Sequence, residues 1–196
     1  MATPFTPAEC EQITLRLREA ARSHAVREGM IKTTVDDLAS DASISKGAFY
    51  RFYASKELLF LDMLDHWQRE IFAKGQQVLD SNAQLPMQER TALAFRTVLQ
   101  SILKNPLEKF FVRDLPVLLR RVPRAVLEKH YRSEEQFLVD VINAIGVKLC
   151  VPPQTAAAAI HILALSIGHA DQVGPSYADG LNALVDAACH RLIASE

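Results

Sequence analysis

Residues 33–58 constrain the fold of this chain more than any other stretch. Thr34 can cap a short helix, and Asp37 follows three residues later, where a carboxylate can return a hydrogen bond to the cap. Ser45 can cap a second short helix, in which Phe49 points inward. Two short amphipathic helices joined by a tight turn predict a helix-turn-helix.

The second of these helices has a small, basic start that suits the major groove of DNA. Gly47 and Ala48 lack bulk, so the helix can approach base edges closely, and Lys46 and Arg51 can donate to phosphates or to guanine. The hydroxyl groups of Ser45 and Tyr50 can bind oxygens of the DNA backbone, and such contacts set the register of the helix on the duplex. The expected DNA contacts are Thr34, Ser45, Lys46, Gly47, Ala48, Tyr50, Arg51 and Lys56.

At these positions the chain resembles the TetR-type one-component transcriptional regulators. The matching residues are Ala20-Ala21, Gly29, Thr33-Thr34-Val35, Leu38-Ala39, Ile44-Ser45-Lys46-Gly47, Phe49-Tyr50 and Ser55-Lys56-Glu57-Leu58. The resemblance covers the N-terminal part of the chain only, since the effector domains of this family diverge widely. A helical corner without a DNA-binding role is the alternative interpretation.

The sequence departs from the family pattern in the turn and near the end of the first helix. Ser43 stands where the turn usually has glycine, so a left-handed backbone there would carry strain. His24 and Ala25 replace a large apolar pair near the end of the first helix, which leaves volume for Met30 or Phe52 to fill.

The remaining pattern predicts an all-α chain of about nine helices, since no hairpin signal such as Asn-Gly occurs. The expected domains are a three-helix DNA-binding domain at 1–54 and a helical bundle for ligand binding and dimerisation at 55–196. Outside the helix-turn-helix, helices are expected at residues 7–28, 55–79, 87–104, 107–121 with an interruption at Pro116, 123–148, 154–169 and 176–194.

Charge and cysteine content bound the class of protein. The formal net charge is −1, but residues 12–58 hold eight Lys/Arg against six Asp/Glu, and the local field matters more for groove binding. Cys10, Cys150 and Cys189 show no close pairing or ligand spacing, which predicts reduced thiols in the cytoplasm. No membrane association is expected, because the most apolar segment, 156–170, is too short to span a bilayer.

The last two predicted helices carry apolar faces with small residues that allow close helix approach. The candidate dimer contacts are Ile160, Leu163, Ile167, Leu181, Leu184, Val185, Ala188 and Leu192. Packing within their own domain is the alternative. The family resemblance implies the dimer, since its members generally pair through a four-helix bundle of two such helices from each subunit.

The middle helices carry aromatic side chains that suit an apolar ligand cavity, although ordinary core packing is the alternative for each. The candidate lining residues are Trp67, Phe95, Phe110 and Phe137, with Arg113 and His130 as polar anchors. A ligand beside the long helix at 55–79 would act on the DNA-binding domain through that helix. The cluster Arg120, Arg121 and Arg124 is interpreted as a solvated helix end, with an anion site as the alternative.

Together these features predict a dimeric repressor that binds a palindromic operator and is released by a small apolar or aromatic effector. A DNA-binding architectural protein without an effector is the alternative. No enzymatic activity, metal or cofactor is expected, because the chain has no His-x-x-x-His pair, no Gly-rich phosphate loop and no nucleophile elbow. His161, His169 and Asp171 are the nearest approach to a metal group, and their spacing is weak.

Overall fold

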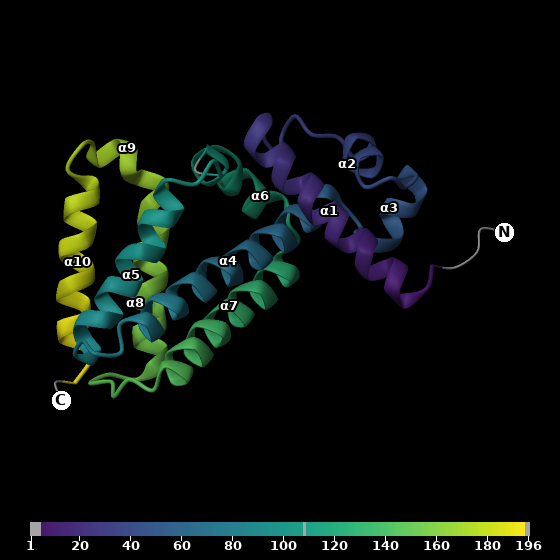
Figure 1. Ribbon diagram of the computed structural model, residues 1–196. Coiled ribbons are helices and arrows are strands. Elements are labelled where there is room, and N and C mark those ends of the chain that lie inside the picture. Colours follow the sequence, from purple (N-terminus) through teal and green to yellow (C-terminus); the bar gives the residue numbers. More distant parts are fainter. Residues whose placement is uncertain (1–4, 108, 195–196) are drawn as a thin grey trace. The chain divides into compact units, whose positions relative to one another are not determined.

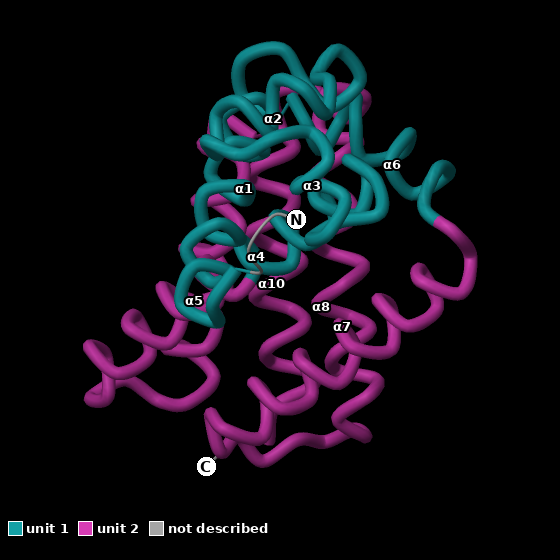
Figure 2. The backbone as a smooth tube through the Cα atoms, turned by 90° about the vertical axis from the view of Figure 1, so that its right-hand side faces the viewer, with its two compact units in different colours: residues 1–68, 109–122 teal, residues 69–108, 123–196 magenta. Residues whose placement is uncertain are grey.

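A computed structural model describes residues 5–107 and 109–194, and within these residues every regular element is a helix (Figure 1). The chain forms two compact units (Figure 2). Unit 1 comprises Met1–Gln68 and Lys109–Val122, and unit 2 comprises Arg69–Glu108 and Pro123–Glu196. The all-α prediction is therefore confirmed. The compact unit that holds the helix-turn-helix extends beyond the predicted DNA-binding domain, because it takes in residues 55–68 and 109–122 as well.

Unit 1 is built from α1 (Pro7–Arg27), α2 (Val35–Asp41), α3 (Lys46–Phe52), the first half of α4 (Lys56–Ser81) and a segment around α6 (Leu115–Arg121). α1 begins at a capping box, since Thr6 and Glu9 exchange hydrogen bonds and proline follows the cap. Ile13, Leu17 and Ala21 of α1 are buried, as are Phe49 of α3 and Phe60 of α4. α1 packs on α2, and α2 packs on α3, so the helix-turn-helix rests on the first helix.

The segment before α6 corrects the prediction of a break at Pro116. Residues Phe110–Asp114 form one π-helical turn, and Leu115 donates its backbone N–H to the carbonyl of Phe110. Pro116 lies in the first turn of the α-helix that follows, where a missing N–H is tolerated. The irregularity therefore precedes the proline. Phe110 is fully buried there, with its ring stacked 5.9 Å from the ring of Phe60.

Unit 2 contains the second half of α4 and four further long helices, namely α5 (Met87–Leu103), α7 (Arg124–Ile145), α8 (Pro153–Ser166) and α10 (Tyr177–Leu192). α8 packs against α7 and α10, and α10 packs against α5 (Figure 1). A 3₁₀ turn (Ile167–His169) and the four-residue α9 (Ala170–Val173) connect α8 to α10. An isolated antiparallel bridge joins Leu149 to Ile193.

Candidate nucleic-acid interface

The two short helices of unit 1 are capped as predicted. Thr34 Oγ1 accepts the backbone N–H of Asp37 at 3.2 Å, and the Asp37 carboxylate accepts the N–H of Thr34 at 2.9 Å. The Asp37 carboxylate also accepts the Thr34 hydroxyl at 2.6 Å, and this hydrogen bond, together with the one from the Thr34 N–H, lowers the pKa of Asp37. Ser45 Oγ accepts the N–H of Ala48 at 3.1 Å. A seven-residue helix has few internal hydrogen bonds, so such caps fix where α2 and α3 begin.

The turn between α2 and α3 has the expected strain. Ser43 adopts a φ of 57°, in the left-handed region that glycine would tolerate better. Its N–H donates to the carbonyl of Ser40, and the N–H of Ile44 donates to the carbonyl of Ala39, both at 2.9 Å. The turn is therefore held by its own backbone, and it sets the angle between the two helices.

The outer face of α3 is open to solvent. Lys46, Gly47, Tyr50 and Arg51 are exposed, while Phe49 between them is buried. Lys46 pairs with Asp36 of α2 at 2.7 Å, which raises the pKa of Lys46. The Arg51 guanidinium lies over the ring of Phe5, 4.8 Å from its centroid, where a cation is attracted to the ring face. Small residues and exposed donors thus share one surface, as major-groove reading requires.

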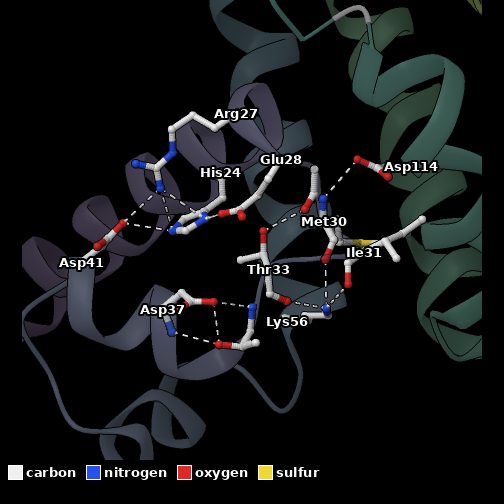
Figure 3. Close-up of polar contacts among 12 residues, drawn as sticks. His24, Arg27, Glu28, Met30, Ile31, Thr33, Asp37, Asp41, Lys56 and Asp114 are labelled. Carbon is white, nitrogen blue, oxygen red and sulfur yellow. Dashed lines mark hydrogen bonds and ion pairs between the residues drawn. The ribbon is translucent and has the colours of Figure 1, made fainter.

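Lys56 has a different environment from the one expected of a phosphate contact. Its ammonium is half-buried and donates to three backbone carbonyls, those of Met30 at 2.9 Å, Ile31 at 3.3 Å and Thr33 at 2.5 Å (Figure 3). Burial lowers the pKa of Lys56. Three acceptors match the three protons of an ammonium group, so Lys56 fastens the loop between α1 and α2 to the start of α4.

We expect Lys56→Met to destabilise the protein by roughly 1–3 kcal/mol, because three carbonyls lose a charged donor. Thermal unfolding followed by circular dichroism measures the effect. The matched control is Lys32→Met, which removes an exposed lysine from the same loop. Equal melting temperatures for the two variants would show that the three hydrogen bonds contribute nothing measurable.

The same loop is held from another direction by Asp114, at the end of the π-helical turn. Its carboxylate is fully buried and accepts the backbone N–H of Met30 at 3.1 Å (Figure 3). Arg113 donates to this carboxylate and also to the carbonyl of Glu28 at 3.1 Å. Gly29 has a φ of 86° and leaves room for the pair. Sequence patterns did not indicate this contact, because 84 residues separate the two ends of the hydrogen bond.

His24 is a second buried polar residue that local sequence reasoning missed. Its Nδ1 lies 2.5 Å from the Glu28 carboxylate and its Nε2 lies 3.0 Å from the Asp41 carboxylate, so the ring joins α1 to the end of α2 (Figure 3). Met30, one of the two residues expected to fill volume here, is fully buried. Glu28 follows His24 by four residues, whereas Asp41 is brought to the other side of the ring only by the tertiary structure.

An open hollow of about 390 Å³ lies next to this face of α3. Its lining includes Lys32 and Thr34 at the start of α2, Tyr50 of α3, and Ser55 and Lys56 at the start of α4. The free amides of helix starts suit a phosphate. Lys32 was not among the predicted contacts and is the exposed cation in this place.

The predicted ligand-pocket residues fall into both units. Trp67 is buried against Phe111 at 5.0 Å, and Phe110 and Arg113 make the contacts described above, all within unit 1. In unit 2, His130 lies 3.8 Å from the carboxylate of Glu134. Phe95 alone of the six lines the apolar cavity of about 90 Å³ in unit 2, and Phe137 lines a separate surface hollow.

The predicted dimer contacts divide into three groups. Ile167, Leu181 and Val185 are buried in the core of their own unit. Ile160, Leu163, Ala188 and Leu192 are half-buried and line the apolar cavity, as Val185 also does. Leu184 is exposed, and so are Ile162 and Leu165, which the prediction omitted.

The arginine cluster behaves as a set of separate surface groups. Arg121 lies 3.5 Å from the Glu57 carboxylate within unit 1, and Arg124 lies 2.9 Å from Glu128 on its own helix. No group of three potential metal ligands occurs within residues 5–107 and 109–194. None of the helices in that part of the chain combines the length and apolarity needed to cross a bilayer.

Comparison with known proteins identifies the helix-turn-helix. Residues 17–63, from the middle of α1 to the start of α4, match the family described as bacterial regulatory proteins, tetR family. The transcriptional repressor KstR2 of Mycobacterium tuberculosis is 29% identical over 128 residues, 65% of this chain and 63% of the relative. The matched region therefore spans less than two thirds of that relative's length.

Solved structures extend the likeness of fold to nearly the whole chain. FadR of Thermus thermophilus, a repressor solved with lauroyl-CoA, has a TM-score of 0.64 at 15% identity and covers 93% of this chain and 96% of its own. RolR, solved with resorcinol, has a TM-score of 0.59 at 18% identity, and the match covers 95% of this chain and 97% of RolR. The capped helix-turn-helix and the matched residues agree that residues 17–63 form a DNA-binding domain of the TetR family of transcriptional regulators, which is not a family of enzymes. The solved structures show that the likeness of fold extends over the rest of the chain.

Proposed function

We propose that this protein is a dimeric repressor that binds a palindromic operator and releases it when a small molecule occupies unit 2. The observation that carries the DNA-binding part is the exposed face of α3. There Tyr50 and Arg51 follow small residues on a helix whose start is capped and whose Phe49 is buried. A dimer would present two such faces on one side of a palindrome, one DNA turn apart.

The ligand-responsive part is supported by the apolar cavity in unit 2. An architectural protein has no need of a cavity, because empty apolar space lowers stability unless something fills it. FadR and RolR, which share the fold, were solved with lauroyl-CoA and resorcinol. Cytoplasmic localisation follows from the same proposal, since the DNA target lies there.

Selection from a random duplex pool with the purified protein tests DNA binding and determines the operator sequence in the same experiment. We expect enrichment of a palindromic sequence. Arg51→Ala should then weaken binding to that sequence by about 1–3 kcal/mol if Arg51 reads a base, measured by fluorescence anisotropy at fixed salt.

The control is Arg124→Ala, which removes the same charge from α7, far along the chain from the helix-turn-helix. Nearly unchanged affinity is expected for this variant. A pool that yields no enriched sequence, or equal losses for the two arginine variants, would rule out α3 as the reading element.

A further inference from the structure

Two adjoining sites in unit 2 differ sharply in chemistry, and the first is the apolar cavity. It lies among the second half of α4, α5, α7, α8 and α10, and its volume is about 90 Å³. No charged side chain of the described residues lines it. Of its few polar groups, Thr91 is engaged with the carbonyl of Met87 at 2.7 Å, and burial raises the pKa of Cys189 to about 11, so its thiol stays neutral. Such a cavity accepts only an apolar group.

The second site is a basic surface hollow of about 510 Å³ on α7 and α4. Three exposed cations line it, Arg69, Lys129 and Arg132, and no carboxylate in the described parts of the chain forms an ion pair with them. The one acidic residue of the hollow, Asp140, accepts a hydrogen bond from Gln136 at 2.8 Å. Three cations against one carboxylate leave a positive site whose charges have no internal partner, which suits an anion.

One aromatic pair connects the two sites. Phe137 lines the basic hollow and Phe72 lines the apolar cavity. Their rings meet edge to face, with centroids 5.4 Å apart and planes at 85°. Both side chains are only half-buried, so neither ring is enclosed on all sides.

We propose that unit 2 binds an amphipathic anion, with its charged head on Arg69, Lys129 and Arg132 and its apolar tail inserted past Phe72 and Phe137 into the cavity. An apolar cavity of roughly 150 Å³ in another protein holds one benzene ring, so this smaller cavity has to widen around a longer tail. Gly75 marks where α4 already lies close to α5, since a Cβ there would be 2.9 Å from Val98. The inference rests on the proposed effector response and names the chemical class of the effector.

Calorimetric titration of the purified protein without DNA tests the proposal. The probes are dodecanoate, lauroyl-CoA, coenzyme A alone and 1-dodecanol, so that a carboxylate head, a phosphate-bearing head and each half of the amphiphile are compared. At least one of the two amphiphiles should bind about tenfold or more tightly than coenzyme A and 1-dodecanol, because each half then adds to the other. The tighter of the two identifies the head group.

Two sets of variants assign the sites. The double variant Lys129→Gln, Arg132→Gln should bind the amphiphile about tenfold more weakly at low salt and 1-dodecanol with unchanged affinity. Arg124→Gln, on the same helix, should change neither affinity. Ala159→Leu, and independently Ala188→Leu, should fill the cavity and lower the affinity for ligands that carry the apolar tail. Melting temperatures identify a variant that fails to fold, and the other then carries the test.

Equal binding of 1-dodecanol and the amphiphiles, or loss with Arg124→Gln as large as with the double variant, would overturn the head site. Equal binding of coenzyme A and lauroyl-CoA, with no binding of dodecanoate, would overturn the tail site, as would full affinity in both cavity-filling variants. Failure of the proposed function gives a separate result. In that case an amphiphile binds unit 2 as described, but saturating it leaves operator affinity unchanged.

Discussion

Gly29→Ala is expected to destabilise the protein by roughly 2–5 kcal/mol. A residue with a Cβ loses about 1–2 kcal/mol in the left-handed region, and Gly29 has a φ of 86°. The added Cβ would lie 1.8 Å from Arg113 Nη2 and 2.3 Å from Asp114 Oδ2. Arg113 is partly exposed and can move away. Asp114 is fully buried, and its displacement leaves the Met30 N–H without its acceptor, which costs a further 1–3 kcal/mol or so.

Gly146→Ala is the matched control. Gly146 has a φ of 72°, and beyond the adjoining chain no atom lies within 4 Å of the position its Cβ would take. The loss of stability in Gly146→Ala should therefore come from the backbone strain alone. The difference in the free energy of unfolding between the two variants then measures what the contact with Arg113 and Asp114 contributes. Urea unfolding gives both free energies, and amide exchange at Met30 should accelerate only in the Gly29 variant. Equal destabilisation of the two would mean that Asp114 does not hold the loop.

The contacts around Gly29 also show which parts of the fold local sequence can reveal. The caps at Thr34 and Ser45 were predicted correctly, because a cap and its N–H donor lie within three residues of each other. The left-handed turn at Ser43 followed from the family pattern. By contrast, the tertiary fold alone brings Lys56 to its carbonyls, Asp114 to Met30 and Asp41 to His24. Lys56 in particular stands at a helix start, where sequence alone suggests solvent or phosphate.

Helical periodicity has a related limit. It identified the apolar residues of α8 and α10, but it did not decide which of them face the core of their own unit. Val185 and Leu184 are neighbours on α10, and the first is buried at 1% exposure whereas the second is 59% exposed. Both fit an apolar stripe, since a wide stripe on a helix spans adjacent positions. Packing against α5 makes the choice, and that packing depends on side chains nearly a hundred residues away.

The exposed members of this stripe lead to the second large expected effect. Ile162 and Leu165 of α8 are 67% and 54% exposed, and Leu184 lies on α10, which packs against α8. Three large apolar side chains open to water on adjacent helices suit a partner surface. Since a symmetric dimer would bring the stripe of each protomer against that of the other, we propose that these three residues lie at the seam.

Leu184→Asp would place a charge from each protomer in that apolar seam, at a cost of several kcal/mol per dimer. The variant should sediment as a monomer at micromolar concentration and lose about 100-fold or more in operator affinity, because two linked recognition helices bind far more tightly than one. Leu15→Asp is the control for assembly, since Leu15 is a similarly exposed leucine on α1 and its variant should remain dimeric. A dimeric Leu184→Asp protein, or a monomeric wild type, would remove α8 and α10 as the seam. A monomeric Leu184→Asp variant that keeps full operator affinity would instead show that one recognition helix is sufficient for binding.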